Sequence, residues 1–193
     1  MKTFCPTAGI RQLLFLMFLA AGPALFAQNY STTGLSDDWQ DPEAWTCSNG
    51  NCSTGYPDAN ISGTVVLNHD INYYGNPPIN VLRKGVLVVN QATFNNNSNL
   101  NIRAGGEFRA TASTVTIGPG VLNVDGEMTL TNSLVIKDGN VVNNSSITLS
   151  GACFSLLSGN FNNFGMLAGT GGIKVLSGNM NNSGSWDPTI RYY

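Results

Sequence analysis

The feature that most constrains this chain is a short glycine–asparagine motif that returns at nearly constant intervals. It occupies residues 139–144, 159–163 and 178–182, and each copy begins with glycine, at Gly139, Gly159 and Gly178. Such a short, regular period is typical of proteins built from stacked repeats, in which each unit buries its apolar face only against its neighbours. Any secondary structure in this part of the chain has to fit within one such period.

Short segments of alternating apolar and polar residues fill the intervals around these motifs. They are residues 100–102, 115–117, 122–124, 128–130, 134–136, 147–149, 154–156 and 173–175. Alternation with a period of two residues indicates strands with one buried face. The strand centres advance by six or seven residues, so three strands fit in one period and no helix of ordinary length fits between them.

Three strands per unit predict an all-β fold, a three-faced, right-handed parallel β-solenoid (β-helix). We expect residues 61–193 to form about six coils of 19–20 residues, each rising by about 4.8 Å, the spacing of strands in a sheet. The apolar ends of the segments, such as Met128 and Leu130, would point inward and fill a continuous column. A β-sandwich is the alternative fold, but its strands are usually about five residues or longer.

The glycines and asparagines of the motif have separate predicted roles. Gly139, Gly159 and Gly178 are expected at tight corners, where a positive φ favours glycine. The Asn pairs are expected where the chain turns again, because asparagine tolerates the left-handed conformation better than most residues. The residues predicted to stack as a ladder of amides are Asn143, Asn162 and Asn181. Such a ladder either holds the corners or offers a row of amides to sugar hydroxyls.

Residues 1–27 have the organisation of a secretory signal peptide rather than of a folded segment. Lys2 and Arg11 precede or flank an apolar run over residues 13–21, and small residues lead to Ala27. The run is much shorter than the roughly 20 apolar residues that span a membrane, and no later stretch is long enough to do so. We therefore expect residues 1–27 to be removed and the mature protein to be secreted, extracellular or held at the outer cell surface.

Charge composition limits the classes of partner. The chain has 9 Lys and Arg, 11 Asp and Glu and a net charge of -2, which excludes the basic surface expected of a nucleic-acid-binding protein. Charged residues make up only 10% of the sequence, too few for a coiled coil or a charged helical bundle. The expected partners are a polysaccharide or surface glycan, or another extracellular protein.

The segment from residue 28 to residue 60 is predicted to form an N-terminal cap. The open end of a solenoid exposes apolar side chains and unpaired strand edges, so terminal coils need covering. Trp39 and Trp45 are large enough to cover that end. The alternative is that the two indole rings form a platform on which sugars stack.

Cysteine usage fits export. Four residues separate Cys47 from Cys52, and an oxidising environment favours a disulfide between them. A zinc site would need more thiols or histidines at matched spacing, and His69 is the single histidine. Cys153 lies in an apolar alternation and is expected as a small buried thiol.

Taken together, these motifs resemble a known family. A signal peptide, a W-x-D-P-x-x-W segment at residues 39–45 and the later G-N-x-x-N-N coils are similar to the secreted right-handed β-helix repeat proteins of Bacteroidota. The resemblance covers most of residues 35–186. It implies export, a β-helix fold and a role as a surface adhesin or carbohydrate-associated protein.

Acidic residues on one predicted face raise the alternative of a polysaccharide lyase or glycoside hydrolase. Glu107 and Glu127 occupy equivalent positions in successive predicted units, so they are expected to stack, with Asp125 close by. Two neighbouring carboxylates serve as acid and nucleophile in glycoside hydrolysis, and such oxygen ligands also bind Ca²⁺. A lyase would need a cation, for which Arg103 and Arg109 are candidates. The simpler alternative is that the carboxylates are solvated and partly offset by Arg109.

No complete catalytic set is evident, so we expect a non-enzymatic module for surface adhesion or extracellular structure. The first candidate contacts for a glycan are Asn143, Asn162 and Asn181, and the second are Trp39 and Trp45. No cofactor is expected apart from the calcium alternative.

Overall fold

The computed structural model describes residues 29–32, 45–47, 58–73 and 78–193, with side chains from residue 59 onward. Several predictions fall outside this part of the chain. They concern the signal peptide (residues 1–27) and the side chains of Trp39, Trp45, Cys47 and Cys52.

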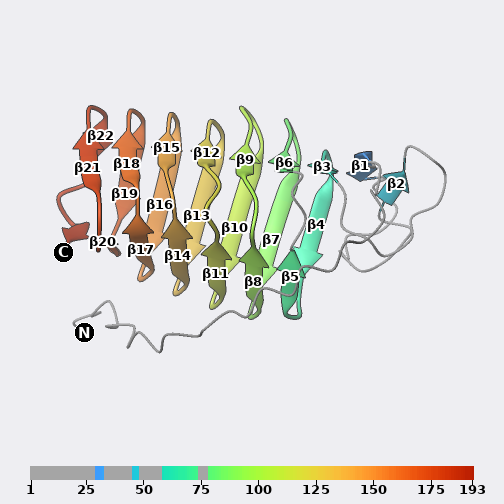
Figure 1. Ribbon diagram of the computed structural model, residues 1–193, viewed down its shortest axis with the longest axis horizontal. Coiled ribbons are helices and arrows are strands. Elements are labelled where there is room, and N and C mark those ends of the chain that lie inside the picture. The colour runs from blue at the N-terminus through green and yellow to red at the C-terminus, as the bar shows by residue number, and fades with distance from the viewer. Residues whose placement is uncertain (1–28, 33–44, 48–57, 74–77) are drawn as a thin grey trace, which may run out of the picture.

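Three sheets run along the length of the molecule (Figure 1). Sheet A has the order β2 (Trp45–Cys47), β1 (Asn29–Thr32), β3 (Asp58–Ile61), β6 (Ile79–Val81), β9 (Leu100–Ile102), β12 (Leu122–Val124), β15 (Val141–Asn143), β18 (Asn160–Asn163) and β21 (Asn179–Asn182). Sheet B has the order β4 (Thr64–Leu67), β7 (Val86–Asn90), β10 (Glu107–Thr111), β13 (Glu127–Thr131), β16 (Ser146–Ser150), β19 (Met166–Gly169) and β22 (Ser185–Trp186). Sheet C has the order β5 (Ile71–Tyr73), β8 (Thr93–Asn96), β11 (Thr114–Ile117), β14 (Leu134–Asp138), β17 (Cys153–Ser158), β20 (Gly172–Val175) and β23 (Arg191–Tyr192).

The chain visits sheets A, B and C in turn, so three successive strands make one coil. Coil 1 contains β3, β4 and β5, coil 7 contains β21, β22 and β23, and six turns separate β3 from β21. Every paired strand is parallel to its neighbour except β1 and β2, which are antiparallel. The predicted all-β, three-faced parallel solenoid is confirmed, and its first strand begins at Asp58, three residues before the expected start. Within the described residues, no helix is long and apolar enough to cross a membrane.

Coil length changes along the solenoid. Thr64 of β4 lies level with Val86 of β7, whereas Met166 of β19 lies level with Ser185 of β22, so the later coil is three residues shorter. The predicted repeat length is therefore right for the C-terminal coils and too short for the first ones. Part of the difference lies at the corner between sheets A and B, which holds four residues in coils 2 and 3 (82–85 and 103–106) but two in coil 4 (125–126).

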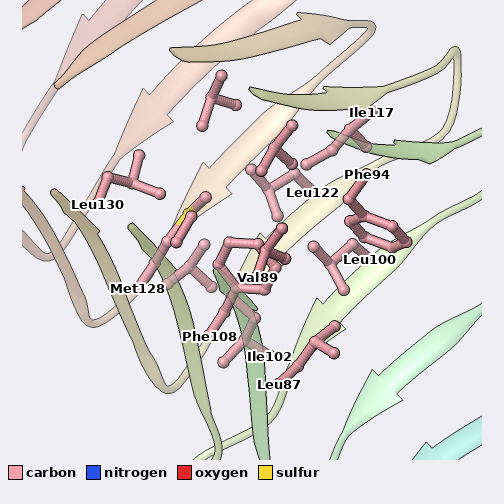
Figure 2. Packing of buried hydrophobic residues seen from close by; sticks show 14 of the residues in the cluster. Leu87, Val89, Phe94, Leu100, Ile102, Phe108, Ile117, Leu122, Met128 and Leu130 are labelled. Atoms are coloured by element: carbon pink, nitrogen blue, oxygen red, sulfur yellow. The ribbon is translucent and has the colours of Figure 1, made fainter. Parts of the chain in front are cut away.

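Alternate side chains of the strands point inward and form one apolar column. Figure 2 shows part of it, where Leu87 of β7, Phe94 of β8 and Ile102 of β9 reach the interior from the three sheets. All three are fully buried, and so are Met128 and Leu130, as predicted. Burying an apolar side chain of this size stabilises the fold by about 1.5–3 kcal/mol, so the column is the main reason that the coils stack.

Strand β14 has the opposite face inward from that predicted. Val135 and Lys137 are buried, while Leu134 and Ile136 are half-buried on the outer side. The register explains the difference, because Val135 and Lys137 lie level with the inward residues of β11. Neighbouring coils, rather than the alternation within the segment, decide which face is buried.

Lys137 therefore lies inside the column with no exposed surface. Its Nζ donates to the carbonyl oxygens of Gly118 at 2.7 Å and Gly120 at 2.6 Å, and also to that of Asp138. Burial lowers the pKa of Lys137 to about 8. The three carbonyls give a partner to each N–H of the ammonium group, which offsets part of the cost of burying its charge.

The predicted glycine corners are confirmed. The φ angles of Gly139, Gly159 and Gly178 are +92°, +93° and +123°. A Cβ atom on Gly178 would lie 1.6 Å from the carbonyl oxygen of Gly159. Glycine is therefore required here both by the backbone conformation and by the close approach of successive coils.

Cys153 differs from its predicted state. It lies at the start of β17 and is half-buried rather than buried. It is disulfide-bonded, and its partner sulfur belongs to a side chain outside the described residues. The prediction of a buried thiol at Cys153 is therefore wrong.

Candidate binding surface

A row of asparagines follows the outer face of sheet A. Strands such as β6, β12 and β15 are three residues long with both ends buried, so only the middle residue faces outward. The outward residues, in coil order, are Asn60, Asn80, Asn101, Asn123, Val142, Asn162 and Asn181. We call these six asparagines the outer amide row. Val142 interrupts it in coil 5.

Side-chain amides of the outer amide row bond to one another along the solenoid, with Nδ2 donating to Oδ1 of the preceding coil. The bonds run from Asn80 to Asn60 (3.0 Å), from Asn101 to Asn80 (2.9 Å), from Asn123 to Asn101 (2.8 Å) and from Asn181 to Asn162 (2.8 Å). Each bond uses one of the two N–H donors of an amide and one of the two lone pairs of its acceptor. A donor and a lone pair on each asparagine are left for water or a ligand.

The predicted ladder is wrong at Asn143. This residue lies level with Asn163 rather than Asn162, points inward and has no exposed surface. Its Nδ2 donates to Asn163 at 2.6 Å, and Nδ2 of Asn163 donates to Asn182 at 2.6 Å. These three residues form an inner amide row, in which Asn143 and Asn163 are buried and Asn182, in the last coil, is exposed. Asn162 and Asn181 are in register, as predicted.

A second outward row lies beside the outer amide row in the C-terminal coils. Nδ2 of Asn179 donates to Asn160 at 3.2 Å, and the backbone N–H of Asn160 donates to the side chain of Asn140 at 3.0 Å. Asn140 and Asn179 are exposed. Asn160 and Asn162 are both half-buried on the outer side of β18. We call Asn160, Asn162, Asn179 and Asn181 the amide surface.

Exposed apolar side chains border the amide surface at both corners of sheet A. Phe164, which is 59% exposed, follows β18 at the corner to sheet B. On the side of sheet C, Leu157 lies near the end of β17 and is 40% exposed, and Leu176 follows β20 and is 51% exposed. An aromatic ring beside amides with spare hydrogen-bonding capacity suits a sugar, whose ring has apolar faces and a polar rim.

Sequence reasoning missed the N-terminal members of the outer amide row. The signal was present, because Asn101 and Asn123 stand at the centres of the predicted segments 100–102 and 122–124, a position that alternation turns outward. Accessibility differs along the row. Asn101 is only 6% exposed, whereas Asn80, Asn123 and Asn162 are all half-buried. Asn181 is exposed, so the last coil presents the most accessible amide of the row.

The carboxylates of the enzyme hypothesis lie on a different sheet. Glu107 and Glu127 are in register on the outer face of sheet B, as predicted. Arg109 donates to both carboxylate oxygens of Glu107, through Nε and through Nη2 at 2.6 Å, and this bonding raises the pKa of Arg109. Glu107 is therefore held as the acceptor of an ion pair.

Asp125 lies at the corner between sheets A and B. It accepts a hydrogen bond from Asn144 at 2.7 Å and lies 4.0 Å from Arg103. In the described part of the chain, no group of three or more Asp, Glu, His or Cys side chains is placed to hold a metal ion. Glu107, Asp125 and Glu127 do not form such a group among the described residues, and the calcium alternative stays a prediction.

Comparison of the chain with protein-family models, with curated proteins and with solved structures found no match. The fold defines the class of protein, a parallel β-solenoid. The similarity to secreted β-helix repeat proteins of Bacteroidota stays a prediction.

Proposed function

We propose that the protein is an exported, non-enzymatic β-solenoid module for surface adhesion or extracellular structure. In this proposal the amide surface binds a polysaccharide or surface glycan. The observation that carries it is that the exposed Phe164 follows β18 directly, two residues after the outward Asn162, whose amide bonds to Asn181 and keeps spare hydrogen-bonding capacity. The amides would bond to sugar hydroxyls, and the ring would pack against the apolar face of a sugar.

The direction of the rows supports an extended ligand. Asn162 and Asn181 follow one another along the solenoid axis, at about 4.8 Å per coil. A single neutral hydrogen bond contributes only about 0.5–1.5 kcal/mol, so useful affinity requires contacts on several coils. A polymer supplies such repeated contacts and a monosaccharide does not.

Co-sedimentation with a panel of insoluble polysaccharides, with and without Ca²⁺, tests the proposal. We expect saturable retention by at least one polymer and a loss of about tenfold in affinity in the double variant Asn162→Ser, Asn181→Ser, which corresponds to about 1.4 kcal/mol. The matched control is Asn72→Ser, Asn95→Ser. These two residues make the same kind of amide bond, at 2.7 Å, on sheet C.

Two results would contradict the proposal. One is an equal loss of retention in the sheet A variant and the sheet C control, because binding would then not depend on the amide surface. The other is that no polymer retains the wild-type protein, which would favour another extracellular protein as the partner.

A polysaccharide-cleaving enzyme that uses Glu107 and Glu127 is the alternative function. The observation in its favour is that the two carboxylates stack in register on sheet B. It predicts the release of reducing ends or unsaturated products from a polymer of the panel, abolished by Glu107→Gln or Glu127→Gln. A binding module would release neither product.

A further inference from the structure

The corners between sheets A and B in coils 2 and 3 are two residues longer than the corner in coil 4. They occupy residues 82–85 and 103–106, and one stacks directly on the other. The backbone N–H of Lys84 donates to the carbonyl oxygen of Gly105 at 2.7 Å. Each corner is also closed by an internal bond, of 2.8 Å in coil 2 and 2.7 Å in coil 3. We call this pair the stacked corners.

The stacked corners carry three exposed cations, Arg83, Lys84 and Arg103. In the described part of the chain, neither Arg83 nor Lys84 forms an ion pair, whereas Arg103 lies 4.0 Å from Asp125. A Cβ atom on Gly105 would lie 3.1 Å from Cγ of Arg83. The stem of Arg83 therefore lies against Gly105 of the neighbouring corner.

Lys84 occupies a conformation that ordinarily favours glycine. Its φ is +67°, and Gly105, its equivalent in the next coil, has a φ of +75°. Other non-glycine residues with positive φ are Gln91, Ala112 and Asn132, all at corners between sheets B and C. Backbone strain alone thus does not mark a site. The position of Lys84 shows that a charged side chain replaces a glycine there, at a cost of about 1 kcal/mol.

The stacked corners and the amide surface share one edge of the solenoid. Arg103 and Phe164 each follow directly after a sheet A strand, and each backbone N–H bonds to the strand of the preceding coil. They lie three coils apart, about 14 Å at the usual strand spacing. Asp125 and Asn144 occupy the two coils between them and bond to each other at 2.7 Å.

The charges near the stacked corners leave a positive balance. Glu107 is bound by Arg109, and Asp125 is bound by Asn144 and faces Arg103. Glu127, which is exposed on sheet B, contributes one further negative charge. Arg83 and Lys84 contribute two positive charges. An anionic group is therefore attracted to the sheet A side of this edge.

We infer that the stacked corners bind the carboxylate or sulfate groups of an acidic polysaccharide. The inference rests on the proposed glycan-binding function and specifies its ligand as a polyanion that runs along the edge between sheets A and B. Arginine presents parallel donors that match such groups, and lysine adds a mobile point charge. One exposed contact of this kind is weak, so a polymer with a charge on successive sugars is the ligand that these cations fit.

Two matched pairs of polymers test the inference by titration calorimetry. They are polygalacturonate with its methyl ester, and dextran sulfate with dextran. We expect the double variant Arg83→Gln, Lys84→Gly to bind the charged polymer about tenfold more weakly, with a smaller dependence on salt, and to keep its affinity for the uncharged one. The glycine relieves strain at position 84, so the variant should fold. The charge-matched control is Lys174→Gln, Arg191→Gln, on sheet C.

Three outcomes would decide against the inference. The inference would be overturned, and the proposed function would stand, under two joint results. The wild-type protein would bind both members of each pair with equal affinity, and the double variant Asn162→Ser, Asn181→Ser would bind them more weakly. If the control variant on sheet C weakened binding of the charged polymer equally, net charge alone would explain the loss, and the inference would also be overturned. If none of these polymers and no polymer of the insoluble panel bound, the proposed function itself would fail.

Discussion

The N-terminal and C-terminal coils differ most clearly at the inward position just before the corner between sheets A and B. In coils 2–4 this position is apolar: Val81, Ile102 and Val124. In coils 5–7 it is an asparagine: Asn143, Asn163 and Asn182. The pairing of the sheet A strands keeps this position in register in both halves, so the position accepts either an apolar column or a row of bonded amides. Away from the border, where Val124 lies level with Asn143, each residue at this position has neighbours of its own kind above and below.

The largest expected effect comes from placing an amide among the apolar neighbours. Ile102 is fully buried and lies level with Val81 and Val124. Ile102→Asn removes apolar burial and leaves a buried amide without a partner, so we expect a loss of about 4 kcal/mol in the free energy of unfolding. Urea denaturation measures the total, and hydrogen exchange in coils 2–4 locates the effect.

The control for this variant lies at the border between the two halves. Val124→Asn places its amide level with Asn143 on one side, so it gains a partner and should cost clearly less than Ile102→Asn. Equal losses in the two variants would show that the identity of the neighbours does not matter.

The reverse exchange should have a somewhat smaller effect. Asn163→Leu leaves the amides of Asn143 and Asn182 without their central partner, which we expect to cost about 3 kcal/mol. Asn162→Leu, one residue earlier but on the outer side of β18, should cost less than about 1 kcal/mol. Similar losses from both substitutions would argue against an energetic role for the inner amide row.

Lys137, at the border between the halves, predicts a dependence of stability on pH. Its pKa is about 8 in the folded protein and about 10.4 in an unfolded chain. Between these values the unfolded state binds more protons, so the free energy of unfolding should rise with pH, by roughly 2 kcal/mol. Lys137→Met should remove this rise. The measurement is urea denaturation of both proteins from about pH 7 to about pH 10.5, and parallel curves would contradict the prediction.

The smallest effect is expected on the outer face. Val142 interrupts the outer amide row between Asn123 and Asn162. Val142→Asn should connect the two parts, and its free energy of unfolding should exceed that of Val142→Ser by about 0.5–1 kcal/mol. If the serine variant were equally stable, the outer row would be an arrangement of surface side chains with no energetic coupling along the solenoid.

The fold was predictable because the solenoid repeats the same arrangement of strands and corners in every coil. Gly159 and Gly178 fix the period and their own corners, and Asn162 and Asn181 each follow their glycine at the same offset of three residues. The error at Asn143 came from aligning the motifs on their asparagine pairs. Counting from the glycine places Asn143 at an offset of four residues, level with the inward members of the later coils.

The remaining features depend on contacts between coils, which a single segment does not reveal. The alternation in residues 134–136 predicts that Leu134 and Ile136 are buried. The register with β11 instead buries the opposite face of the strand, which includes Lys137. The stacked corners lie in coils 2 and 3, where no glycine–asparagine motif marks the period. Their extra residues become visible only when the strands on either side are paired.

The constant register of the later coils has a consequence for how such a chain can change in evolution. Residues 141–160 contain β15, β16 and β17, which is one complete coil. Their loss would bring Phe161, Asn162 and Asn163 onto β12 in place of the strand removed, because those residues already occupy equivalent places one coil further on. Asn123 would then meet Asn162 directly, and the interruption at Val142 would disappear. Tandem duplication or deletion of whole coils can thus lengthen or shorten the protein without requiring a new interface between coils. The length of polymer that the protein contacts would change with it.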